Sequence, residues 1–336
     1  MKNRFVFFDS TPADHRYFSH HLRNFGAELV FYKEPISEQN IQLAENANVI
    51  SVHVASKVSA AVMHALPHLQ FIAARTTGYD NIDVEAAKKA NITVSNAPRY
   101  GENTVAEYTF MLLLALSRKV FPSVEQNKSG KIDHSVLTGF DLSGKTLGVI
   151  GTGSIGQHVI RIANGFSMPV IAYDPFPNNN LENDYNLRYV NLHELFASAD
   201  IITLHAPYTG ENKHLINTQA FASMKKGAIL INTSRGELVD TKALVAVLAS
   251  GKLGGAGLDV VEGENLLLLN EESELLHNKS LRGFDYAVEQ MVLEKMPNVI
   301  ITPHNAFNSK EAIERINITT LENISNFFKQ MPTNTV

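Results

Sequence analysis

The sequence LGVIGTGSIGQHVIRIA, residues 147–163, joins a short apolar run, three glycines in GxGxxG spacing and the start of a helical pattern. Gly151, Gly153 and Gly156 would let backbone N–H groups approach a pyrophosphate at the helix N-terminus, where the helix dipole favours anions. Because glycines at this spacing also occur in tight turns that bind nothing, the motif needs support from its context. Asp174 closes the next apolar run about 20 residues further along, as a dinucleotide site requires. The stretch therefore predicts a Rossmann-type unit that binds a dinucleotide.

Asp174 also indicates which dinucleotide would bind. Its carboxylate can accept hydrogen bonds from both ribose hydroxyls, and it would repel a 2′-phosphate. The residues that follow, PFPNNN at 175–180, include no base that could hold such a phosphate. These residues favour NAD over NADP.

Short β-rich runs alternate with helical patterns along most of the chain, which is typical of βαβ units and a parallel sheet. The first series of runs is 5–10, 27–32, 48–55, 69–76 and 92–98. The second series is 146–151, 169–174, 200–207, 228–232, 255–260 and 298–303. Helical patterns cover 12–26, 83–91, 103–121 and 309–330. Asn103 or Thr104 is the expected N-cap of the third helix.

The second series is a complete six-strand set, and the last helix follows it. A chain of 336 residues is also long enough for two domains. We therefore expect a discontinuous substrate (catalytic) domain, residues 1–100 and 304–336. The NAD-binding Rossmann domain would be residues 101–303, with a ligand cleft between the two domains.

Composition limits the kinds of partner and site. The formal net charge of −5, from 34 acidic and 29 basic residues, argues against a nucleic-acid or anionic-membrane partner. The absence of cysteine excludes disulfides and Cys-based metal sites, and we expect no metal. The start MKNRFVFFDS is typical of a first strand rather than a signal peptide, and FMLLLALS at 110–117 is too short to span a bilayer. We expect a soluble cytoplasmic protein.

Polar and ionisable residues follow several expected strands, at the edge where open parallel sheets bind ligands. They are Asp174; His205, Ala206 and Pro207; Thr233, Ser234 and Arg235; Asp259 and then Glu264; and Pro303 and His304. Each has an ordinary explanation, since Arg235 could pair with Glu237 or Asp240, and a lone His304 would more often be structural. Their joint placement favours a site in which Arg235, Glu264 and His304 act together.

Six motifs occur together in the order seen in one enzyme family. GTGSIG, YDP, LHAP, INTSRGELVD, GLDVVEGE and ITPHNAF resemble the D-isomer-specific 2-hydroxyacid dehydrogenases. The resemblance spans nearly the whole chain, including TTGYDNID and APRYGENTVAE in the first domain, and it is strongest to the D-lactate dehydrogenases. It implies an α/β protein with a Rossmann-type NAD-binding domain, a flavodoxin-like substrate domain, and a homodimer built through the cofactor domains.

The resemblance also implies roles for individual residues. The catalytic set would be Arg235, Glu264 and His304. The substrate would contact Gly78, Tyr79, Tyr100, Arg235, His304 and Phe307. NAD would contact Thr104, Gly151, Gly153, Ser154, Ile155, Gly156, Asp174, His205, Ala206, Pro207, Asn212, Thr233, Ser234, Arg235 and Asp259. The long mixed segment 265–297 would affect the rim of the substrate pocket.

These roles imply that the protein reduces pyruvate to D-lactate with NADH. His304 would donate a proton to the carbonyl oxygen, Glu264 would stabilise the imidazolium, and Arg235 would bind the carboxylate with its forked donors. One alternative is a dehydrogenase of the same family acting on glyoxylate, hydroxypyruvate, a branched 2-oxo acid or phosphite. Another is a corepressor-like protein that senses NAD without catalysis.

Overall fold

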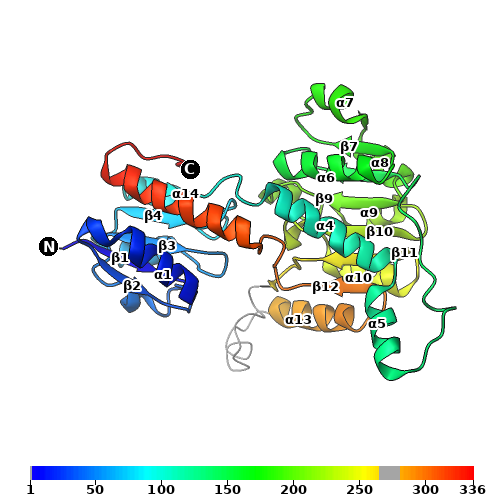
Figure 1. Cartoon of the computed structure of the whole chain (residues 1–336), viewed down its shortest axis with the longest axis horizontal. Coiled ribbons are helices and arrows are strands. Elements are labelled where there is room, and N and C mark those ends of the chain that lie inside the picture. The colour runs from blue at the N-terminus through cyan, green and yellow to red at the C-terminus, as the bar shows by residue number, and fades with distance from the viewer. Residues whose placement is uncertain (1, 265–280) are drawn as a thin grey trace. The chain divides into compact units, whose positions relative to one another are not determined.

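The computed structural model describes residues 2–264 and 281–336, which form two compact units (Figure 1). The first unit comprises Met1–Tyr100 and Ser309–Val336, and the second comprises Gly101–Asn308. The first unit is therefore made from two separate stretches of the chain. Residues 265–280 of the segment 265–297, which was expected to affect a pocket rim, lie outside the described residues.

The first unit is a parallel sheet between two layers of helices. Its described residues form five strands in the order β2-β1-β3-β4-β5, which is the order of a flavodoxin-like sheet. The strands are β1 (Arg4–Phe7), β2 (Glu28–Phe31), β3 (Val49–Val52), β4 (Phe71–Ala74) and β5 (Thr93–Ser95). The helices are α1 (Pro12–His21), η1 (Arg23–Phe25), η2 (Ile41–Ala44), α2 (Ala60–His64), α3 (Val84–Lys89) and α14 (Lys310–Phe328).

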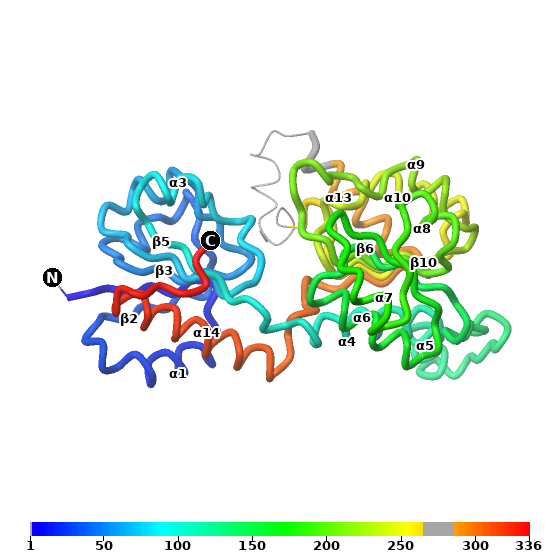
Figure 2. The backbone as a smooth tube through the Cα atoms, turned by 90° about the horizontal axis from the view of Figure 1, so that it is seen from above, coloured from blue at the N-terminus to red at the C-terminus, as the bar shows by residue number. Residues whose placement is uncertain are grey.

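Each face of this sheet has its own apolar core. On one face, Phe5 and Phe7 pack with Phe18 of α1 and Ile324 of α14. On the other face, alternate strand residues pack against α2 and α3. Figure 2 shows α1 and α14 on one side of this sheet and α3 on the other. Burial on both faces explains why the strands are nearly continuous apolar runs.

The second unit has the same layered plan with a larger sheet. Its described residues form seven parallel strands in the order β12-β11-β10-β9-β6-β7-β8. They are β6 (Leu147–Ile150), β7 (Val170–Tyr173), β8 (Leu187–Tyr189), β9 (Ile201–Leu204), β10 (Ala228–Asn232), β11 (Leu253–Leu258) and β12 (Val299–Ile301). The order reverses between β6 and β9, which is where ligands bind in such sheets. The expected α/β class, Rossmann-type in this unit and flavodoxin-like in the other, is confirmed.

Helices cover both faces of this second sheet. One face is covered by α4 (Glu102–Ser117) and α6 (Ser154–Gly165), and the other by α8 (Leu192–Ser198), α9 (Thr218–Ser223), α10 (Thr241–Ala249) and α13 (Leu281–Glu294). The other helices among the described residues of this unit are α5 (Val120–Ser129), α7 (Asn180–Tyr185), η3 (Gly210–Asn212) and η4 (Gly236–Leu238).

Three expectations about this unit are wrong. The second series has seven strands rather than six, because the edge strand β8 has one buried residue, Leu187, and no apolar run to reveal it. The helix expected over 103–121 is two helices, since α4 ends at Ser117 and Lys119 takes a left-handed conformation before α5. The break places Pro122 in the first turn of α5, where its missing N–H is tolerated. Neither Asn103 nor Thr104 is the N-cap, because α4 already begins at Glu102 after Gly101.

Candidate active site

The glycine turn between β6 and α6 has the geometry of an anion-binding turn. Gly151 has a φ of +94°, and a Cβ there would lie 2.7 Å from the nitrogen of Ala206. A Cβ on Gly156 would lie 2.1 Å from the Gly151 carbonyl oxygen, so α6 packs directly on the turn. Gly153, in contrast, has nothing within 4 Å of its Cβ position. Among the described residues no side chain caps α6, so the N–H groups of Ser154 and Ile155 at its start can serve an anion.

Asp174, directly after β7, is held beside this turn. Its Oδ2 accepts hydrogen bonds from the Thr152 N–H at 2.8 Å and from the Thr152 hydroxyl at 3.0 Å. Its Oδ1 accepts one from the Phe176 N–H at 2.9 Å. Because a carboxylate has about four acceptor positions, Asp174 retains capacity for ribose hydroxyls.

Thr152 and Tyr189 support this arrangement, and neither residue was expected from the sequence. The Thr152 hydroxyl lies 2.9 Å from the Tyr189 hydroxyl on β8. Thr152 stands between two motif glycines, a position that could have drawn attention to it. Tyr189 carried no such signal, because its strand was not expected.

His205, directly after β9, is half-buried, with its ring turned into the protein. Its Nε2 lies 2.7 Å from the Thr203 hydroxyl, and burial lowers the pKa of His205 to about 3. Within the described part of the chain its Nδ1 is buried and has no hydrogen-bond partner. A buried polar atom without a partner is uncommon, and it marks this place as one where a ligand could supply the partner.

The residues after β10 form a tightly bonded turn. The Asn232 side chain accepts from the Ser234 N–H at 3.0 Å and donates to the Arg235 carbonyl at 2.8 Å. The Ser234 hydroxyl donates to the Ala206 carbonyl, and the Thr233 hydroxyl lies 2.9 Å from the Thr109 hydroxyl on α4. The turn fixes the backbone from which the half-buried Arg235 side chain extends.

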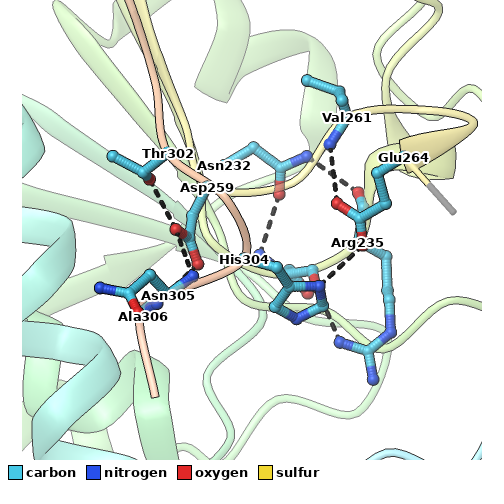
Figure 3. Close-up of polar contacts among 10 residues, drawn as sticks. Asn232, Arg235, Asp259, Val261, Glu264, Thr302, His304, Asn305 and Ala306 are labelled. Carbon is cyan, nitrogen blue, oxygen red and sulfur yellow. Dashed lines mark hydrogen bonds and ion pairs between the residues drawn. The ribbon is translucent and has the colours of Figure 1, made fainter. Parts of the chain in front are cut away.

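The turn that carries His304 is built around Asp259, a carboxylate with 1% of its surface exposed. One Asp259 oxygen accepts from the Asn305 N–H at 2.8 Å and from the Thr302 hydroxyl, and the other accepts from the Ala306 N–H at 2.7 Å (Figure 3). The His304 N–H donates to the Asp259 carbonyl at 2.9 Å. His304 has a φ of 49°, an uncommon conformation for a residue with a side chain. Asp259 therefore holds the turn in the form that presents His304.

His304 and Glu264 contact each other directly. The His304 Nδ1 lies 2.7 Å from the Glu264 Oε1, and 23% of each side chain is exposed. In Figure 3 the Arg235 side chain also extends toward the His304 ring. Arg235, Glu264 and His304 follow β10, β11 and β12, three neighbouring strands of one sheet. The structure therefore brings together the three residues that the sequence placed at this edge.

The other site residues expected from the sequence are divided between the two units. Asn212 closes its own loop by donating to the Pro207 carbonyl at 2.8 Å. Thr104 is buried in the first turn of α4, and Phe307 lies in the second unit. Gly78, Tyr79 and Tyr100 belong to the first unit. Their contacts with substrate or cofactor stay predictions.

Comparison with known proteins identifies the family. The model of the family described as D-isomer specific 2-hydroxyacid dehydrogenase, NAD binding domain, matches residues 110–306. The chain belongs to this family. It is an NAD-dependent D-2-hydroxyacid dehydrogenase, and the expected enzyme class and cofactor are confirmed.

The dehydrogenase resembles whole relatives as well. It is 39% identical to 2-hydroxyacid dehydrogenase homolog 1 of Schizosaccharomyces pombe, over 97% of both chains. The crystal structure of D-lactate dehydrogenase from Aquifex aeolicus, complexed with NAD and lactic acid, matches with a TM-score of 0.87 and 34% identity, covering 97% of this chain and 96% of that one. The structure of D-2-hydroxyisocaproate dehydrogenase matches with a TM-score of 0.82 and 32% identity, covering 99% and 98%.

The residues of the dehydrogenase fit NAD. The uncapped start of α6 suits the pyrophosphate, Asp174 suits ribose hydroxyls, and the buried Nδ1 of His205 lacks a partner among the described residues. Over the same described part, no group of three or more His, Cys, Asp or Glu side chains could hold a metal ion. No described helix is long and apolar enough to cross a membrane.

Proposed function

We propose that the dehydrogenase reduces pyruvate to D-lactate with NADH, using Arg235, Glu264 and His304. The observation that carries the proposal is the 2.7 Å contact between His304 and Glu264 at the edge where ligands bind in such sheets. NADH, when bound, supplies the hydride that reduces C2 of the 2-oxo acid. The residues of the protein must then provide a proton and bind the substrate anion.

His304 is the proton donor in this proposal. Its Nδ1 faces Glu264, which leaves Nε2 as the nitrogen that can give a proton to the carbonyl oxygen. Within the described residues no hydrogen bond involves this Nε2. The hydrogen-bond partner of one ring nitrogen sets which role the other nitrogen takes. Glu264 thus fixes the orientation of the ring.

Arg235 binds the substrate anion. Its Nη1 donates to the Ser234 carbonyl at 2.8 Å, which holds the guanidinium close to its own turn. A guanidinium has five N–H donors in a planar fork that matches a carboxylate. Arg235 can therefore bind the carboxylate of a 2-oxo acid and polarise its ketone.

The first unit offers backbone donors of the kind that a carboxylate needs. The Thr76 hydroxyl donates to the Gly78 carbonyl at 2.6 Å, which fixes the start of the expected substrate loop. Within the described residues the N–H groups of Gly78 and Tyr79 have no acceptor. This supports their proposed role in binding the carboxylate, while Tyr100 and Phe307 are proposed to select substrate by size.

Pyruvate is favoured because a D-lactate dehydrogenase with bound lactic acid is among the similar structures. Similarity to a D-2-hydroxyisocaproate dehydrogenase supports one alternative, a branched 2-oxo acid. A steady-state assay with NADH should compare pyruvate, glyoxylate, hydroxypyruvate, a branched 2-oxo acid and, in the oxidative direction, phosphite with NAD. We expect the highest kcat/KM with pyruvate and D-lactate as the product. L-lactate as product, or a higher kcat/KM with another substrate, would contradict the proposal.

We also infer a homodimer. Apolar side chains are exposed on α5 and after it, at Val120, Phe121, Val124, Ile132 and Val136. An exposed cluster of this kind is typical of a protein–protein contact. Light scattering should give the mass of two chains, and Phe121→Asp should shift the mass toward one chain.

A further inference from the structure

Next to the proposed site, outside the residues assigned to it, Glu262 is a buried carboxylate with 4% of its surface exposed. A buried charge is costly unless it is paired and hydrogen-bonded. Three groups meet its Oε1: the Tyr286 hydroxyl at 2.9 Å, the His214 Nε2 at 2.9 Å and the Lys213 Nζ at 3.2 Å. We call these four residues the Glu262 cluster.

The cluster joins three segments that are far apart in the sequence. Lys213 and His214 directly follow η3, and Tyr286 lies on α13. Glu262 itself lies in the turn after β11 that ends at Glu264. The cluster therefore ties this turn to a loop on one side and to a helix on the other.

The turn of Glu264 is also in close contact with the turn of Arg235. A Cβ on Gly236, the residue after Arg235, would lie 2.2 Å from the Val261 carbonyl carbon and 2.5 Å from the Glu262 nitrogen. Only glycine permits this backbone contact. The His214 N–H donates to the Glu237 carbonyl at 2.9 Å, so the cluster also holds the segment after Arg235.

One residue of the cluster has a backbone conformation that needs such support. His214 has a φ of 54°, which is uncommon for a residue with a side chain, whereas Gly263 has a φ of +76°, which glycine adopts readily. A Cβ on Gly263 would lie 2.8 Å from the Tyr286 ring, so the turn packs directly on α13. Left-handed residues persist where the surroundings fix them. Glu264 follows Gly263 directly, and its direction depends on this backbone.

We propose that Glu262 is a positioning residue, which locks the turns of Arg235 and Glu264 together so that Glu264 meets His304. This inference rests on the proposed roles of Glu264 and His304. Glu262 acts through backbone and cluster contacts and touches neither substrate nor cofactor. Its loss should therefore reduce turnover through Glu264 and leave NADH binding unchanged.

The test is a double-mutant cycle on the whole enzyme, with kcat on pyruvate, the Kd for NADH and Tm measured for each variant. Glu262→Gln keeps the size of the side chain and removes the negative charge that Lys213 and His214 contact. We expect kcat to fall about 10- to 100-fold, the loss that a misplacement of about 1 Å causes, with the NADH Kd unchanged. In a Glu264→Gln background the same substitution should change kcat less than about twofold, since residues acting through one unit are not additive.

Two further variants are measured beside the cycle. Tyr286→Phe removes a single hydroxyl from the cluster and should lower kcat less than Glu262→Gln does. In the Glu264→Gln background Tyr286→Phe should leave kcat unchanged, and it replaces Glu262→Gln in the cycle if that variant does not fold. Glu294→Gln removes a charge from the exposed end of the same helix, α13, and should leave kcat, Kd and Tm at parent values.

The outcomes separate this inference from the proposed function. Parent-like turnover in Glu264→Gln alone would overturn the proposed catalytic set. A large loss in Glu264→Gln combined with parent-like kcat in Glu262→Gln and Tyr286→Phe would overturn only the positioning role. A lower Tm with unchanged kcat, or equal fold-losses in both backgrounds, would also overturn it, because Glu262 would then act without Glu264.

Discussion

Asp259→Asn is the substitution whose effect can be worked out most fully from the structure. An asparagine carbonyl can replace the oxygen that accepts from Asn305 and Thr302. Its amide nitrogen would then face the Ala306 N–H, which now lies 2.7 Å from a carboxylate oxygen. The new amide N–H and the Ala306 N–H, two hydrogen-bond donors, would then face each other in the protein interior. The cost is the loss of one charge-assisted hydrogen bond and a buried unsatisfied N–H, together about 2–4 kcal/mol.

The expected result has a thermal and a kinetic part. For a protein unit as large as the second unit, a loss of about 2–4 kcal/mol in the free energy of unfolding corresponds to a Tm lower by about 5–15 °C in calorimetry. Because the turn presents His304, kcat on pyruvate should fall about 10- to 100-fold. Asp184→Asn makes the same change on an exposed carboxylate of α7 and should alter neither value. If Asp259→Asn raised only the KM or Kd for NADH and left Tm and kcat unchanged, Asp259 would be a cofactor contact and would not hold the turn of His304.

Three other substitutions change residues that are expected at the NAD site. Gly156→Ala places a Cβ 2.1 Å from the Gly151 carbonyl oxygen and should abolish NADH binding measured by fluorescence, whereas Gly210→Ala, with nothing within 4 Å, should bind normally. Asp174→Ser removes the carboxylate that opposes a 2′-phosphate and should lower the ratio of kcat/KM with NADH to that with NADPH; an unchanged ratio would remove Asp174 from cofactor choice. Burial lowers the folded-state pKa of His205 to about 3, from its ordinary value of 6.5, so the unfolded chain binds more protons between these pH values. Stability should therefore fall as pH drops from about 6.5 toward 3, by up to about 1.4 kcal/mol per pH unit, and His205→Gln should flatten this dependence in urea unfolding; parallel curves for both proteins would contradict it.

Local patterns in the sequence were sufficient for the fold class and the cofactor. Strands buried on both faces are apolar runs, and the glycine turn follows one of them directly. The same reasoning missed β8, because an edge strand of three residues with one buried side chain leaves no such pattern. The division of the long helix had a signal in Pro122, since a helix continuing through it would need the N–H that proline lacks.

The site was predictable in outline because the ends of parallel strands meet at one edge of a sheet. That rule placed Arg235, Glu264 and His304 together without any knowledge of their contacts. The supporting contacts could not be predicted in this way. Asp259 binds donors 43 to 47 residues away, and Glu262 meets His214 48 residues away. Such pairings arise from tertiary packing, and local sequence patterns do not predict them.

The proposed function requires that His304, oriented by Glu264, gives the proton when a 2-oxo acid is reduced. The most direct measurement compares single-turnover reduction of pyruvate by pre-bound NADH in the parent enzyme and in His304→Gln, which cannot donate a proton in the same way. We expect a rate lower by about 10²- to 10⁴-fold, the usual contribution of a positioned acid, with the Kd for NADH within about twofold of the parent. A parent-like rate in His304→Gln with NADH bound would contradict it.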